Sequence, residues 1–106
     1  MIESGITAGL FAAESAHEAA ERKSPGWKDD AYHAFKTVGR NLGHFTTEQV
    51  RALSPEIPAP RDERAWGGVA LRALRDGLIE PDGFVRAQSR SVHGQMVRRW
   101  KWTGEA

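Results

Sequence analysis

The apolar residues of the chain repeat with a helical period in three separate stretches. Within residues 27–43 they recur at every third or fourth position, which predicts a helix with one buried side: Ala31, Phe35, Val38 and Leu42. A short extended piece at residues 44–45 follows. Thr46 then predicts the start of a second, shorter helix, because Gln49 stands three residues later as in a capping box, and Leu53 continues its apolar side.

Residues 62–77 predict a third helix, which buries a single apolar stripe: Trp66, Val69, Ala70, Ala73 and Leu74. At about 100° per residue, the opposite side carries small or basic residues: Arg64, Gly68, Arg72 and Arg75. Gly77 predicts the end of the helix. A glycine early in a helix costs about 1 kcal/mol relative to alanine. Close packing is the favoured reason for Gly67, whereas for Gly68 both close packing and backbone approach to a phosphate stay open.

Two further segments frame these helices. Residues 6–23 are rich in alanine and free of proline, so they predict another helix, which Ser24, Pro25 and Gly26 end. Residues 54–61 hold three prolines and predict a loop of constrained shape. We therefore expect a helical extension over residues 1–24 and one domain over residues 25–106. The extension either packs on that domain or mediates self-association.

The C-terminal stretch predicts a two-stranded hairpin. Residues 81–83 form a turn signal, a first strand runs to about Gln88, and residues 96–102 return after a tip at residues 89–95. Because strand side chains alternate, one face of the return strand holds Met96, Arg98, Trp100 and Trp102, and the other holds Val97, Arg99 and Lys101.

Charge is distributed unevenly along the chain. The net charge is +1, but residues 1–60 hold six Lys/Arg against eight Asp/Glu, and residues 61–106 hold nine against six. The two parts therefore carry −2 and +3, which indicates an anionic partner for the second. Residues 83–102 hold five Lys/Arg and no acid. Charge that only protects an edge strand from aggregation would explain the basic residues but not the lack of acids.

The order of these elements resembles a winged helix-turn-helix domain. The resemblance rests on "HFTTEQVRAL", "RAWGGVALRALRDGLIEPDGFVRAQSR" and "QMVRRWKW", and covers about residues 27–102. The segments "ERAWGGV", "GLIE" and "SRSVHGQMVRRW" are similar to small winged-helix proteins of bacteriophages and prophages. The proline-rich loop and the alanine-rich extension depart from that pattern. The implied fold is mostly α with a small β-hairpin: three core helices, a C-terminal wing and an extra N-terminal helix.

The resemblance implies duplex DNA binding, with the third helix in the major groove and the hairpin on the backbone or in the minor groove. On the recognition helix the matching positions are Arg61, Arg64, Gly68, Arg72 and Arg75. On the wing they are Arg86, Gln88, Arg90, His93, Arg98, Arg99 and Lys101. Arginine suits both guanine edges and phosphates. We therefore expect a cytoplasmic regulatory or replication-accessory protein of phage or prophage type.

Two other functions stay open at this point. The fold can serve as a protein-interaction module that dimerises through the N-terminal helix, with Leu71 at the edge of the basic face as its interface residue. The hairpin can instead bind single-stranded nucleic acid or RNA by stacking bases on Trp100 and Trp102, although same-face tryptophans on a strand more often belong to a core. The chain lacks catalytic constellations and metal-ligand spacing, so we expect neither enzymatic activity nor a metal, cofactor or membrane association.

Overall fold

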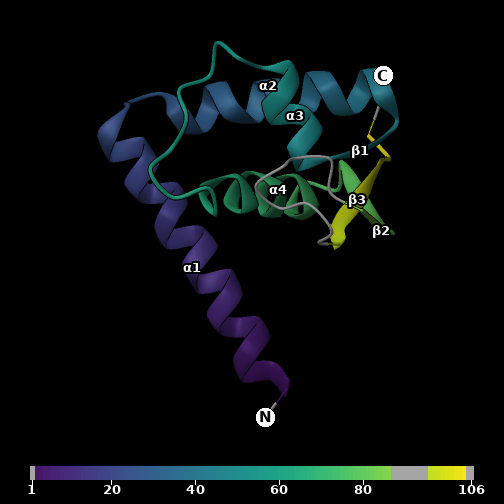
Figure 1. Cartoon of the computed structure of the whole chain (residues 1–106), viewed down its shortest axis with the longest axis horizontal. Helices are drawn as coiled ribbons and strands as arrows, with labels where there is room; N and C mark the ends of the chain where they lie inside the picture. The colour runs from purple at the N-terminus through teal and green to yellow at the C-terminus, as the bar shows by residue number, and fades with distance from the viewer. Residues whose placement is uncertain (1, 87–95, 105–106) are drawn as a thin grey trace.

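The computed structural model describes the backbone of residues 2–86 and 96–104, and the side chains from residue 13 onward within these ranges. This part of the chain forms four α-helices and a three-stranded antiparallel sheet (Figure 1). The elements run in the order α1 (Ile2–Lys23), α2 (Trp27–Leu42), β1 (His44–Thr46), α3 (Thr47–Leu53), α4 (Ala65–Arg75), β2 (Ile79–Arg86) and β3 (Met96–Trp102). The prediction of a mainly helical α+β fold is confirmed. None of the described helices has the length and apolar character needed to cross a membrane.

The sheet places the return strand of the hairpin in the middle. Its order is β1–β3–β2, with Phe45 opposite Trp100 and Val85 opposite Val97. The turn signal at residues 81–83, expected before the hairpin, lies inside β2, where the register shifts between Pro81 and Phe84. Gly83 has φ 78°, which permits this bulge. Pro81 is tolerated because β2 is an edge strand.

Local signals in the sequence determine several helix ends. The capping box at the start of α3 is confirmed: the backbone N–H of Gln49 donates to Thr46 Oγ1 at 3.2 Å, and that of Thr46 donates to Gln49 Oε1 at 2.9 Å. Gly43 and Gly77, with φ 77° and 73°, follow α2 and α4 in the left-handed region.

The core lies between α2, α4 and the inner end of the sheet. Phe35 and Phe45 meet edge to face with ring centroids 5.1 Å apart, and so do Trp27 and Trp66 at 5.4 Å. Trp27 also donates its indole N–H to the backbone oxygen of Pro58 at 2.8 Å, which ties the proline-rich loop to the core.

Two leucines expected in the core are exposed. Leu42 is 44% exposed and Leu53 is 60% exposed. Each is the last residue of its helix. The apolar period therefore continues past the point where a neighbouring element covers it, which the sequence pattern alone does not reveal.

The N-terminal helix packs on the rest of the chain. The second half of α1 crosses α4, while its N-terminal end extends away from the other elements (Figure 1). Ala16 and Ala20 of α1 belong to the hydrophobic core. Glu21 fixes the junction with α2, because its carboxylate accepts backbone N–H groups from Gly26 at 2.8 Å and Lys28 at 2.9 Å. Of the two roles expected for this helix, packing on the domain is the one observed.

Candidate nucleic-acid interface

α1 packs against the side of α4 that the sequence predicts to read DNA and covers it at Gly68, while the side chains of Arg64, Arg72 and Arg75 stay 66%, 40% and 67% exposed. Gly68 is buried, and a Cβ atom built on it would lie 2.5 Å from Cβ of His17. Beside it, Gly67 faces Ala13, with a corresponding distance of 3.3 Å. Gly68 therefore packs against α1 within this chain, and its contact with a DNA groove stays a prediction. Helical spacing correctly marks the side opposite the core stripe, but it does not predict which other segment lies there.

The arginines of that side are paired with carboxylates. Arg72 Nη1 lies 3.1 Å from Asp29 Oδ1, and Arg75 pairs with Glu14. Both acids come from the first third of the chain, so part of the predicted basic face is neutralised within the molecule. Arg64 also has an ion pair, but its partner Asp62 lies only two residues away in the sequence; Arg64 Nη2 is 2.7 Å from Asp62 Oδ2. Arg64, which precedes α4, and Arg72 and Arg75 within it therefore do not form a free cationic surface.

Arg72 of α4 also packs against α2. Its guanidinium lies 4.0 Å from the ring centroid of Tyr32, and the Tyr32 hydroxyl donates to Asp76. Burial, followed by the hydrogen bond to Asp76, raises the pKa of Tyr32. These contacts give Arg72 a structural role that accounts for its position without any ligand.

The outer part of the hairpin presents cations that no carboxylate of the described residues pairs with. Antiparallel partners share a face, so Phe84 and Arg98 lie together, as do Arg86 and Met96. All four side chains are exposed, Phe84 at 57% and Met96 at 59%. The Arg98 guanidinium lies 5.0 Å from the ring centroid of Phe84 and 5.6 Å from that of Trp100. Neither arginine has an ion pair within the described part of the chain. Gln88, Arg90 and His93, also predicted as wing contacts, lie outside the described residues.

The opposite face of the hairpin is internally paired. Arg99 Nε lies 2.9 Å from Asp82 Oδ2 and donates to the backbone oxygen of Asp82 at 3.1 Å. His44 Nδ1 approaches the same carboxylate at 2.6 Å. The hydrogen bond from His44, together with the charge of Arg99, lowers the pKa of Asp82. Arg99 therefore holds the bulge at Asp82 rather than standing free, while Lys101 is exposed on this second face.

The tryptophans of β3 do not form a stacking platform. Trp100 is buried, and Trp102 is half-buried with the Arg40 guanidinium 5.6 Å from its ring centroid. This agrees with the core interpretation and removes the basis for base stacking on these two residues. Among the aromatic side chains that the structure describes, it is Phe84 that is strongly exposed, at 57%, and the sequence analysis missed it. The residue that could have indicated this exposure is Gly83, because the bulge there shifts the register of β2 and changes which of its side chains share a face with Arg98.

Comparisons with protein-family models, curated protein sequences and solved structures find no match to this chain. Within the residues that the structure describes, no cluster of three histidine or acidic side chains is arranged to hold a metal ion. The candidate site therefore rests on the geometry of the hairpin itself.

Proposed function

We propose that this protein binds duplex DNA as a winged helix-turn-helix domain whose hairpin, β2 and β3, makes the main contact. The element order from α2 to β3 is the one that the sequence resemblance implies, and β1 joins the hairpin in one sheet. The observation that carries the proposal is the pair of exposed arginines on one hairpin face, Arg86 and Arg98, without carboxylate partners in the described residues.

The covered face of α4 changes the mechanism that the sequence suggests. With α1 across it, α4 supports the hairpin rather than entering the major groove. Contacts from the hairpin then go mainly to phosphates, which position a protein on DNA but carry little sequence information. Phe84 and Met96 add exposed apolar surface beside the two arginines, suited to sugar and base edges in a minor groove. We therefore expect duplex binding with weak sequence preference.

The test is fluorescence anisotropy with labelled duplex and single-stranded DNA over a series of salt concentrations. Each phosphate contact adds about 0.9 to the slope of log affinity against log salt. The double variant Arg86→Gln/Arg98→Gln should therefore lower the slope by up to about 2. Lys36→Gln/Arg40→Gln removes the same charge from α2 and serves as the matched control. A wild-type slope near zero, or equal effects of the two double variants, would refute the hairpin as the DNA contact.

Self-association is a second candidate, favoured by a mainly apolar hollow of about 370 Å³ where α1, α3, α4 and β3 meet, which Arg51 and Arg98 also line. Leu71, half-buried, lines it together with Leu74, Val97 and Trp100. The occupant would be a second copy of the chain, because the N-terminal end of α1 extends past its own body (Figure 1). Sedimentation should then show a dimer that Leu71→Glu dissociates and Leu53→Glu, outside the hollow, leaves intact. A monomer at all concentrations excludes this role.

A further inference from the structure

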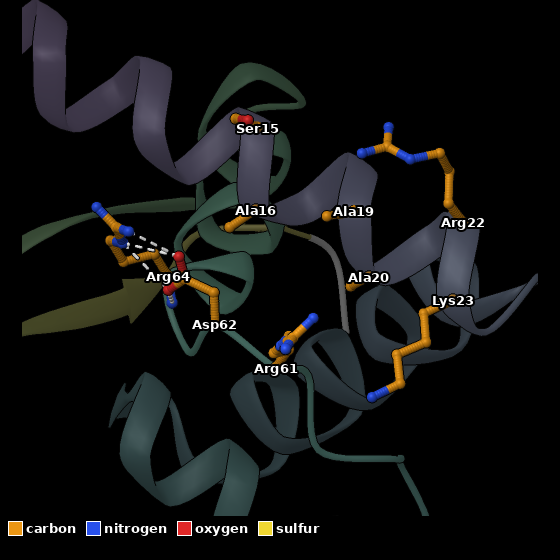
Figure 2. Close-up of a pocket in the computed structure, with 9 residues that line it drawn as sticks. All are labelled: Ser15, Ala16, Ala19, Ala20, Arg22, Lys23, Arg61, Asp62 and Arg64. Atoms are coloured by element: carbon orange, nitrogen blue, oxygen red, sulfur yellow. Dashed lines mark hydrogen bonds and ion pairs between the residues drawn. The ribbon is translucent and has the colours of Figure 1, made fainter.

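A second basic site lies at the other end of α4 from the hairpin. A groove of about 710 Å³ separates the last turns of α1 from the segment that enters α4. Its cationic side chains come from both sides: Arg22 and Lys23 from α1, and Arg61 and Arg64 from the segment before α4 (Figure 2). Alanines of α1 form its floor, so no bulky side chain among the described lining residues fills the space between the charged groups.

The acids around this groove are already engaged. Asp62, its one carboxylate, accepts hydrogen bonds from the Arg64 side chain and from the Arg64 backbone N–H at 3.0 Å (Figure 2). The Arg64 side chain is the main reason that the pKa of Asp62 lies below its usual range. On α1, Glu18 pairs with Lys28, and Glu21 accepts the backbone N–H groups that begin α2.

Three of the groove's cations have no ion pair in the described part of the chain: Lys23, Arg61 and Arg22, whose charge acts on the nearby Glu18. All three line this groove. Arg22 and Lys23 extend in different directions from the last turn of α1, and Arg61 comes from the opposite side of the groove (Figure 2). Lysine and arginine near the end of a helix also interact favourably with its dipole, which would account for Arg22 and Lys23. That interaction does not account for Arg61, which reaches the same groove from a segment about 40 residues further along the chain.

We propose that this groove binds phosphate groups, held by Arg22, Lys23 and Arg61. Guanidinium groups bind phosphate oxygens in a forked geometry, and the alanine floor lets a phosphate approach close to α1. The inference rests on the proposed function for the source of the phosphates, which is the DNA backbone. The groove then supplies a second anchor, separated from the hairpin by α4, whose 11 residues span about 16 Å.

The first experiment compares three variants by anisotropy with duplex DNA over a salt series. Arg22→Gln/Lys23→Gln/Arg61→Gln should lower the slope of log affinity against log salt by about 2 to 3. Arg22→Lys/Arg61→Lys keeps the charge and should retain most of the slope. Asp62→Asn removes the one acid of the groove but keeps an oxygen for the Arg64 N–H, so it should tighten binding. The groove is refuted as a DNA anchor if the triple variant binds like the wild type.

A second experiment separates this proposal from the proposed function. Inorganic phosphate is titrated into the ¹⁵N-labelled chain, and the backbone amide signals of Arg22, Lys23 and Arg61 and the guanidinium signals of Arg22 and Arg61 are followed. Saturable shifts at these residues that the triple variant lacks support a phosphate site, even if the wild type binds no duplex. Absence of such shifts, together with an unchanged salt slope in the triple variant, overturns the groove while leaving the hairpin proposal intact. Urea unfolding of each variant verifies that the exposed substitutions leave the fold unchanged.

Discussion

Gly68 of α4 and His17 of α1 lie in direct contact, and the imidazole occupies the space that a side chain at position 68 would need. A Cβ atom there would be 2.5 Å from His17 Cβ and 2.6 Å from Cγ. The crossing of the two helices therefore depends on glycine at this position. Of the two explanations that the sequence left open for Gly68, packing is the one that the geometry supports.

The first prediction concerns the stability of this crossing. Gly68→Ala should lower the free energy of unfolding by about 1–2 kcal/mol, because overpacking outweighs the gain in helix propensity. Gly67→Ala is the matched control: its Cβ would meet Ala13 at 3.3 Å, so a small shift suffices and the propensity gain compensates. Urea unfolding of both variants measures the difference. Equal stability of the two would contradict the close crossing.

The second prediction is a pH dependence that originates at His17. Its ring is buried, lies edge to face with Trp27 at 6.0 Å, and has no hydrogen-bond partner for Nε2. Burial, followed by the charge of Lys28, lowers the pKa of His17 below 6.5. The unfolded state then binds the proton more readily, so stability is greatest above about pH 6.5 and declines as the pH falls towards the lowered value.

The measurement is the free energy of unfolding in urea at several pH values between 7.5 and 5. His17→Leu should flatten the dependence in this window, because it removes the group that titrates. His33→Gln, at an exposed position of α2, should leave the dependence unchanged. If the His17→Leu protein keeps the wild-type pH slope, the dependence has another source.

The third prediction separates hairpin binding from insertion of α4. Arg72 and Arg75 are paired with Asp29 and Glu14, so replacing either by alanine removes no free cation. We expect Arg72→Ala and Arg75→Ala to change duplex affinity less than twofold, whereas Arg98→Ala weakens it severalfold at low salt. Anisotropy titrations at one low salt concentration provide the comparison. A loss with Arg72→Ala as large as that with Arg98→Ala would mean that Arg72 exchanges Asp29 for the DNA when the complex forms.

Structural features that depend on neighbouring residues can be predicted from this sequence, whereas contacts between residues far apart in the chain cannot. The capping box at Thr46 and the helix stop at Gly77 are local, and both are found as expected. The pairing of Arg75 with Glu14 joins residues 61 positions apart, and nothing in the spacing of α4 indicates it. The alternation of side chains along β3 correctly places Arg98 and Arg99 on opposite faces. It does not predict that the Asp82 carboxylate pairs with Arg99 and leaves Arg98 without an ion pair in the described residues.

The last prediction uses that pair of neighbours on β3. Arg99 is held by Asp82 through both its carboxylate and its backbone oxygen, while Arg98 lies against two aromatic rings and has no ion pair within the described residues. Arg99→Ala should therefore lower the free energy of unfolding by about 1 kcal/mol, since it breaks a partly exposed ion pair and a hydrogen bond. Arg98→Ala should leave stability nearly unchanged and weaken duplex binding.

A double-mutant cycle with Asp82→Ala identifies the source of the Arg99 effect. Once Asp82 is gone, Arg99→Ala should cost clearly less than in the wild type, because the ion pair is already lost. Arg98→Ala should show no such coupling to Asp82, since the two side chains lie on opposite faces of the hairpin. Urea unfolding supplies the stabilities, and anisotropy supplies the affinities of the same proteins. If Arg98 and Arg99 prove interchangeable in both measurements, the two faces of the hairpin do not differ as the structure requires, and the assignment of DNA contact to the Arg98 face fails.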